Sequence, residues 1–283
     1  MKKFMAIVLL AVFSVLILAS CGDDGFNDSR EIDVYVREDG SGTRGAFNEL
    51  FGIVEDGTDR TTQEADILQT TAGIITSVSG NVHGIGYISL GSVNSEIKAL
   101  SIDGIGATFD NVLNGSYKVF RPFNVAVSKS SALSEAAQDF MDFILSAQGQ
   151  AVVADRNYIP LQNASDFTSS QPSGSIMVEG SSSVTPLMER LIEAYAGVNP
   201  NATIELQSNS SGVGIASATE GRADIGMVSR ALRESELADL NEIAIALDGI
   251  AIIVHPDNPI TGLTSEQVTN IFIGEATVWN EVR

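Results

Sequence analysis

The sequence has a single cysteine and only two histidines among its 283 residues. One cysteine excludes a disulfide framework and a metal centre built from cysteines. His83 and His255 lie in apolar or turn-like stretches, where a structural role is expected for each. The motifs GxxxxGK(S/T), HExxH, CxxC and GxSxG are all missing, which argues against NTP hydrolysis, zinc-peptidase chemistry and a hydrolase nucleophile elbow. The sequence therefore gives no reason to assign a catalytic residue, a cofactor or a metal.

Positive charge is also scarce, with 16 Lys and Arg against 36 Asp and Glu and a formal net charge of −20. Such an acidic chain is a poor partner for nucleic acid and for the surface of an anionic membrane. Its overall field repels small anions as well, so an anion site would need backbone dipoles and a few well-placed cations. Hydrophobic residues make up 44% of the chain, enough to form the core of one large domain or two modest ones.

The first residues are typical of an export signal. Two lysines precede an apolar run, Met5 to Leu18, that is too short for a membrane span. The segment Leu18-Ala19-Ser20-Cys21 resembles a bacterial lipobox, which implies cleavage before Cys21 and lipidation of that residue. We expect a lipoprotein signal peptide at 1–20 and a polar tether at 21–30. The alternative is an ordinary secretion signal in which the cysteine is incidental.

Strand-like and helix-like patterns alternate along the rest of the chain, which predicts an α/β fold. Residues 162–174 interrupt this alternation with Ser, Gln, Asn, Pro and Gly, and are expected to form a linker. No internal repeat is evident. Strands are expected at 32–36, 84–88, 97–102, 117–127, 175–178, 202–206, 223–227 and 243–254, and helices at 43–51, 69–78, 133–145, 184–195, 212–219, 235–240 and 265–272.

Three segments share one local design, in which a strand leads into a turn rich in Ser and Gly and then into a helix: Arg37–Arg44, Gly180–Pro186 and Ser208–Gly214. A helix N-terminus carries unpaired N–H groups and partial positive charge, and small residues let an anion approach closely. Arg37 could add a two-pronged, charge-assisted grip, with Asp39 orienting it. Taken singly, each turn is better explained by ordinary helix capping. Three such turns in one chain, one of them with an arginine, leave capping and an anion site equally open at this point.

At these turns the chain resembles the phosphate-binding proteins of bacterial phosphate ABC transporters. In the second half the resemblance rests on Glu179-Gly180-Ser181-Ser182-Ser183-Val184, Ala223-Asp224-Ile225-Gly226, Val228-Ser229-Arg230, Leu247-Asp248-Gly249-Ile250-Ala251, Leu263-Thr264-Ser265-Glu266-Gln267 and Ile271-Phe272-Ile273-Gly274. In the first half it rests on 37–43, 84–89, Arg121-Pro122-Phe123, 146–150 and Tyr158-Ile159-Pro160-Leu161. Together these segments span nearly all of the chain after the export signal.

The order of the two halves differs from that of the family. The segment with three consecutive serines opens the family's sequences, whereas here the half that contains Arg37 comes first. The chain is therefore interpreted as a circular permutant, in which the linker 162–174 joins the family's usual ends. The new ends, Ser29 and Arg283, are expected to lie close together in a surface turn. The alternative is a chimeric or truncated gene.

The resemblance implies a two-lobed clamp of the periplasmic-binding-protein type II class, circularly permuted, with a ligand cleft between the lobes. Carried over to this chain, lobe A is split between 31–118 and 256–283. Lobe B is continuous over 119–255 and contains the linker. A hinge closure would enclose the ligand.

The resemblance also implies the residues that bind inorganic phosphate. Some family members use an Asp to accept the proton of monobasic phosphate and so to reject sulfate. The matching position here is Ser229, so Asp39 or Asp248 could act as the acceptor instead. The implied phosphate ligands are Arg37, Ser41, Gly42, Thr43, Ser181, Ser182, Ser183, Ser211 and Ser229.

The function implied is that of an extracytoplasmic lipoprotein that binds phosphate and delivers it to a membrane permease. We expect a monomer that is attached to the cell membrane only through its lipid and has no nucleic-acid partner. Because the Asp is missing, a binding protein for sulfate, molybdate or tungstate stays open. A secreted enzyme acting on phosphate esters, and a fragment that needs a second chain, are the further alternatives.

Overall fold

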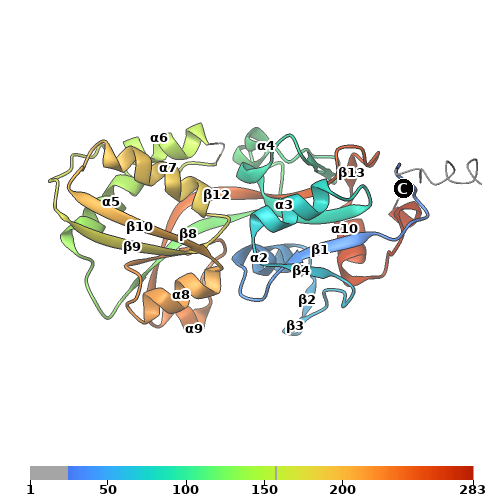
Figure 1. Cartoon of the computed structure of the whole chain (residues 1–283), viewed down its shortest axis with the longest axis horizontal. Coiled ribbons are helices and arrows are strands. Elements are labelled where there is room, and N and C mark those ends of the chain that lie inside the picture. The colour runs from blue at the N-terminus through green and yellow to red at the C-terminus, as the bar shows by residue number, and fades with distance from the viewer. Residues whose placement is uncertain (1–24, 157, 283) are drawn as a thin grey trace, which may run out of the picture.

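The computed structural model describes residues 25–156 and 158–282. The expected signal peptide 1–20, the lipidation site Cys21 and the terminal Arg283 lie outside these residues. Figure 1 shows two lobes side by side, connected by long strands that run from one lobe into the other. No helix in the described part of the chain is both long and apolar enough to cross a membrane.

Lobe A is built on parallel strands in the order β4-β1-β5, to which the end of β12 adds an antiparallel strand. Every residue of β5 is buried, as expected for a strand covered on both faces. The sheet strands are β1 (Asp33–Arg37), β4 (Asp66–Leu68), β5 (Gly84–Ser89) and β6 (Lys98–Ala99). The helices are α2 (Gly42–Leu50), α3 (Thr71–Ser79), α4 (Phe109–Leu113), α10 (Ser265–Ile273) and the 3₁₀ turns η1 (Leu90–Ser92) and η2 (Trp279–Val282). Two small pairs complete the lobe: β2 (Val54–Glu55) with β3 (Thr58–Asp59), and β7 (Ser101–Ile102) with β13 (Gly262–Leu263).

Lobe B repeats this plan with parallel strands in the order β10-β9-β11, followed by the antiparallel strand β8 and then by β12. Its strands are β8 (Phe120–Ser128), β9 (Gly174–Ser181), β10 (Ala202–Asn209), β11 (Ile225–Val228) and β12 (Leu240–Val254). Its helices are α5 (Glu135–Leu145), α6 (Ala147–Asp155), α7 (Thr185–Ala196), α8 (Ser211–Thr219) and α9 (Glu234–Leu237).

The two lobes therefore share one strand arrangement: a first strand flanked by two parallel strands, with an antiparallel strand next to the third. The sequence showed no internal repeat because this repeat lies in the strand topology and not in residue identity.

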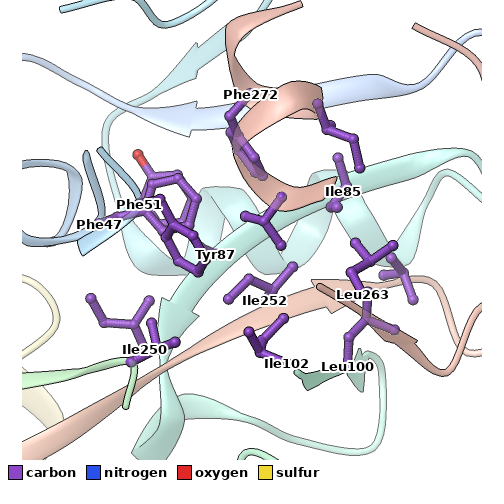
Figure 2. Packing of buried hydrophobic residues seen from close by; sticks show 14 of the residues in the cluster. Phe47, Phe51, Ile85, Tyr87, Leu100, Ile102, Ile250, Ile252, Leu263 and Phe272 are labelled. Atoms are coloured by element: carbon purple, nitrogen blue, oxygen red, sulfur yellow. The ribbon is translucent and has the colours of Figure 1, made fainter. Parts of the chain in front are cut away.

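Each lobe has its own hydrophobic core. In lobe A the rings of Phe47 and Tyr87 stack with centroids 3.9 Å apart, and Phe272 meets Phe47 edge-on at 4.7 Å. Figure 2 shows these rings between the sheet and α10. Full burial of such a ring stabilises the fold by ~1.5–3 kcal/mol. In lobe B the core lies between the sheet and helices α5 and α7, around Phe140 and Tyr195.

The chain passes between the two cores along β8 and β12. Val119 belongs to the core of lobe A and Phe123 to that of lobe B, so the first passage lies near the expected boundary at 118–119. On β12 the change occurs between Ala246 and Ile250. This second passage precedes the expected boundary at 255–256, because the end of β12 pairs with β5 and packs in lobe A.

The expected linker 162–174 has no regular structure before Gly174, where β9 begins. Side chains from α5 and α6 hold it to lobe B. Gln148 accepts a hydrogen bond from the Phe167 N–H at 3.0 Å and donates one to its carbonyl at 3.1 Å. Asp139 accepts a hydrogen bond from Ser169 at 2.6 Å. The segment is thus a strap bound to the lobe surface.

The two ends of the described chain lie together on lobe A. The Asn280 N–H donates to the Asp28 carbonyl at 2.8 Å, and the Ile32 N–H donates to the Thr277 carbonyl at 2.8 Å. Trp279 is fully buried beside them. The two ends of the described chain are therefore adjacent, as the permuted order requires.

Most expected elements are present, with shifted ends. The helix expected at 69–78 begins at Thr71, because the Thr70 hydroxyl caps it by accepting the Gly73 N–H at 3.0 Å. The strand expected from 243 begins at Leu240, where a helix was expected to end. The structure adds the helices α4 and α6, the strands β4 and β13 and the β2–β3 hairpin, for which no pattern was identified.

Candidate anion-binding cleft

Four helix starts meet between the lobes. Lobe A contributes the first residues of α2 and α3, and lobe B contributes the start of α8 and the turn that precedes α7. Hydrogen bonds of Thr43 and Thr71 in lobe A with the hydroxyls of Ser182 and Ser183 in lobe B join the two sides. The positive ends of the helix dipoles are therefore gathered at one place.

The turn between β1 and α2 shapes the α2 side of the cleft. Gly40 adopts a left-handed conformation with φ +85°, which glycine permits without steric cost. Ser41 then caps α2, its hydroxyl accepting the Arg44 N–H at 3.4 Å. Thr43 follows in the first turn, and its hydroxyl reaches the Ser183 hydroxyl at 2.8 Å. The Ser-Gly-Thr segment thus presents backbone donors and a hydroxyl to the opposite lobe.

The lobe B side is a cluster of serine hydroxyls. The Ser181 hydroxyl donates to the Ser229 hydroxyl at 2.9 Å. The Ser211 hydroxyl lies 3.3 Å from that of Ser229 and accepts the Ser229 N–H at 3.1 Å. Each hydroxyl can rotate to donate or to accept, so the cluster can rearrange around a ligand without leaving an unpaired group.

The two walls approach so closely that only glycine fits at position 42. A Cβ atom there would lie 2.3 Å from the Ser211 hydroxyl oxygen and 2.7 Å from that of Ser229. Backbone contact also occurs, since the Gly212 N–H donates to the Gly40 carbonyl at 2.9 Å across the cleft. The two lobes are therefore in direct contact at this point.

All nine residues expected to bind phosphate are brought together and buried: Arg37, Ser41, Gly42, Thr43, Ser181, Ser182, Ser183, Ser211 and Ser229. Ser183, Ser211 and Ser229 have no exposed surface. Their contact with a ligand stays a prediction, but the convergence of segments as distant as Thr43 and Ser183 is a property of the structure.

Arg37 is oriented by Glu38 and not by Asp39, so that part of the sequence interpretation is wrong. Its Nε and Nη2 donate to the Glu38 carboxylate at 2.8 and 2.9 Å. The Asp39 side chain is 95% exposed and pairs with Arg44. The free edge of the guanidinium, Nη1, lies 3.4 Å from the Thr71 hydroxyl in the cleft.

Asp248, the other expected proton acceptor, lies between β8 and β12 and is occupied by other partners. Ser89 donates to it at 2.8 Å and Arg121 pairs with it at 3.2 Å. Burial raises the pKa of this carboxyl to about 6, against the opposing effects of Arg121 and Ser89. No contact in the described part of the chain places Asp39 or Asp248 among the cleft hydroxyls.

Thr71 is a member of the cleft that the sequence analysis missed. It is buried, and its hydroxyl lies 3.1 Å from that of Ser183 and 3.5 Å from that of Ser182. The signal was present in the sequence as two threonines followed by small residues at a helix start. It was overlooked because this start lacks the serine-rich turn of the other three.

The arrangement favours a small oxyanion held mainly by neutral donors. Helix N-termini with hydroxyls bind phosphate-like groups through backbone N–H dipoles, and Arg37 adds one buried cation. Within residues 25–156 and 158–282 no group of His, Cys, Asp and Glu could hold a metal ion.

Comparisons with known proteins agree with this geometry. Residues 22–148 and 165–283 match the family described as the PBP superfamily domain. The chain is similar to the "Phosphate-binding protein PstS 2" of Streptococcus agalactiae serotype V, at 44% identity over 292 residues that cover 100% of this chain and 99% of that protein. It is 45% identical over 275 residues to the protein of that name from Streptococcus pneumoniae serotype 4, with 94% of each chain covered. A crystal structure of a phosphate ABC transporter, phosphate-binding protein from Streptococcus pneumoniae TIGR4 matches with a TM-score of 0.71 at 46% identity, covering 89% of this chain and 100% of that one.

These comparisons also bear on the order of the halves. Because the alignment to the Streptococcus agalactiae protein runs over 99% of its length, that protein has its halves in the same order. The "Phosphate-binding protein PstS" of Pseudomonas aeruginosa matches at 36% identity over only 108 residues, 33% of its length. A partial match is what a different order of halves produces. The order is thus shared by full-length relatives, which removes the reason to suspect a chimeric gene.

Proposed function

The chain belongs to the PBP superfamily and, within it, to the family of the PstS 2 phosphate-binding proteins, and we propose that it binds inorganic phosphate between its lobes for uptake by an ABC transporter. The observation that carries this proposal is the meeting of four helix starts and one buried arginine between the lobes. Helix N-termini gathered in this way supply backbone N–H donors for a phosphate-like anion.

The residues divide into three roles in this proposal. Arg37 supplies the positive charge through its free Nη1 edge. The backbone N–H groups of Gly42 and Thr43, at the start of α2, supply neutral donors that need no counter-ion. The hydroxyls complete the shell, and their contacts across the cleft are replaced by contacts to the anion. They belong to Ser41, Thr43, Thr71, Ser181, Ser182, Ser183, Ser211 and Ser229.

A hydroxyl at position 229 also supports acceptance of a protonated anion. A hydroxyl has two acceptor lone pairs as well as its donor, so Ser229 can take a hydrogen bond from the P–OH group of phosphate. It can equally donate to a fully ionised anion. For this reason the second candidate is binding of another oxyanion, such as sulfate, molybdate or tungstate.

The cellular role follows from the family. We infer that the chain is an extracytoplasmic lipoprotein anchored through Cys21, that it acts as a monomer without catalytic activity, and that it passes phosphate to a membrane permease. Support comes from the lipobox-like Leu18-Ala19-Ser20-Cys21 and from relatives named as transporter binding proteins. Labelling with a radioactive fatty acid in the native host, with Cys21→Ser as the control, tests the anchor.

Isothermal titration of the chain from Gly22 onward tests the ligand. We expect one phosphate per chain and no heat with sulfate, molybdate or tungstate. Binding of one of these anions in preference to phosphate would establish the second candidate. A chain that binds none of them would refute both.

A further inference from the structure

A buried ion pair lies where the chain passes between the lobes. Arg121 on β8 and Asp248 on β12 are directly paired in the antiparallel ladder. The Arg121 Nη2 lies 3.2 Å from Asp248 Oδ2, and the two side chains are 2% and 0% exposed. Each of the two strands that pass between the lobes contributes one residue of the pair. Neither residue is among the cleft residues described above.

The pair connects the two lobes through its remaining atoms. On the lobe A side, the Ser89 hydroxyl at the end of β5 donates to Asp248 Oδ1 at 2.8 Å. On the lobe B side, Arg121 Nη1 donates to the main-chain carbonyl of Ser229 at 3.0 Å. The chain of contacts thus runs from β5, through both passage strands, to the backbone of a residue whose hydroxyl lies in the cleft.

Sheet stability alone does not account for this pair. Two buried charges lose their hydration, and an apolar pair of similar volume is often as stable or more stable. Burial lowers the pKa of the Arg121 guanidinium, an effect that Asp248 opposes. What an apolar pair cannot supply is the guanidinium fork, which here places Nε and Nη2 on Asp248 and Nη1 on Ser229.

The position of the Ser229 main chain, which Arg121 holds at the carbonyl, is critical for the cleft. The Ser229 hydroxyl accepts from Ser181 at 2.9 Å and lies 3.3 Å from Ser211. These three side chains come from three different segments of lobe B. A shift of the Ser229 backbone would therefore disturb the hydroxyl cluster as a whole.

We propose that Arg121, oriented by Asp248, is a positioning residue for the anion site, which holds the Ser229 backbone so that the cleft hydroxyls converge. This proposal rests on the proposed binding of phosphate. It assigns Arg121 no contact with the ligand.

Arg121→Lys tests the proposal, because lysine keeps the charge beside Asp248 but lacks the fork that reaches Ser229. We expect phosphate affinity, measured by isothermal titration, to fall by about tenfold or more. Arg190→Lys is the matched control, since Arg190 forms an exposed pair with Glu193 on the outer face of α7 and should leave the affinity unchanged.

A double-mutant cycle separates positioning from a merely structural role. If Arg121 acts through Ser229, Arg121→Lys should weaken phosphate binding much less in a Ser229→Ala background than in the wild type. A structural role would give the same fold loss in both backgrounds, and that result would overturn the proposal. So would an affinity of Arg121→Lys within about threefold of the wild type.

Arg121→Gln combined with Asp248→Asn covers the case in which the lysine variant fails to fold. This neutral amide pair keeps a hydrogen bond between the passage strands but provides no guanidinium for Ser229. We expect a cooperative thermal transition together with a loss of phosphate affinity of about tenfold, and full affinity would overturn the proposal. A wild-type chain that binds no phosphate would refute the proposed function itself, whereas tight wild-type binding that these variants share would refute only the role of Arg121.

Discussion

The hydroxyl oxygen of Thr43, in the first turn of α2, lies 2.8 Å from the hydroxyl oxygen of Ser183, in the turn before α7. The two residues belong to different lobes and to opposite halves of the sequence. Their contact defines the closed arrangement of the clamp, in which residues from both lobes face one gap. An anion that replaces this hydrogen bond would be held by both lobes and would stabilise closure.

Arg37→Ala is expected to weaken phosphate binding by more than tenfold, about 1.4 kcal/mol or more. Arg37 is the only cation among the proposed ligands, and the alanine variant leaves the anion with neutral donors in a chain of net charge −20. Titration calorimetry measures the loss. Arg60→Ala, which removes an exposed arginine of the β2–β3 hairpin paired with Glu55, is the control. Equal affinities of the two variants would remove Arg37 from the site.

Gly42→Ala is expected to block closure of the cleft. Its Cβ atom would lie 2.3 Å from the Ser211 hydroxyl oxygen, although alanine suits the start of a helix at least as well as glycine. We expect the thermal midpoint of the ligand-free chain to be unchanged, while phosphate no longer reduces the radius of gyration in small-angle X-ray scattering. Gly106→Ala, whose Cβ would meet nothing closer than 3.8 Å, should compact like the wild type. Compaction of Gly42→Ala would contradict the narrow gap.

Thr70→Val and Thr71→Val are expected to have opposite effects, although the residues are neighbours. Thr70 caps α3, so its loss should lower the free energy of unfolding by about 1 kcal/mol and leave phosphate affinity intact. Thr71 points into the cleft, so its loss should weaken phosphate binding by about threefold to tenfold, since a hydrogen bond contributes about 0.5–1.5 kcal/mol. Denaturant titration and calorimetry of both variants give the comparison, and reversed effects would exclude Thr71 from the site.

Asp248 is expected to make the stability depend on pH in one direction. Burial raises the pKa of this carboxyl from 3.8 to about 6 in the folded chain, so the folded state binds the proton more tightly than the unfolded state does. This group therefore contributes full stability below about pH 3.8, and the contribution is lost as the pH rises through about 6. The free energy of unfolding of the wild type minus that of Asp248→Asn should fall between pH 4 and pH 7. A difference that rises over this range would mean that Arg121 lowers the pKa of Asp248.

Sequence patterns predicted the parts of the site that local chemistry determines. Serine and glycine before a helical pattern indicate a helix start. The structure has such starts in both serine-rich segments of lobe B, with α7 beginning within 180–186 and α8 within 208–214. The orientation of Arg37 was beyond reach, because Glu38 and Asp39 are both acidic and both lie within two residues of it, and no local pattern says which of them pairs with the guanidinium. The pairing of Arg121 with Asp248 depends on the register of two strands that are more than a hundred residues apart, for which no local pattern exists.

The order of the halves was read from motif positions, and the structure explains why it is tolerated. The ends near Asp28 and Asn280 are hydrogen-bonded to each other in lobe A, and the strap 162–174 lies along lobe B. The exchanged order therefore opens one connection between adjacent ends and closes another along the surface of a lobe.

A crystal structure of the chain grown with phosphate tests the central claim most directly. We predict one tetrahedral anion in the gap between α2 and the 181–183 turn, within hydrogen-bonding distance of Arg37, Thr43 and Ser183, with the Thr43–Ser183 hydrogen bond replaced by contacts to the anion. A phosphate found away from these residues, or a gap that stays closed by its own hydroxyls in saturating phosphate, would contradict the account.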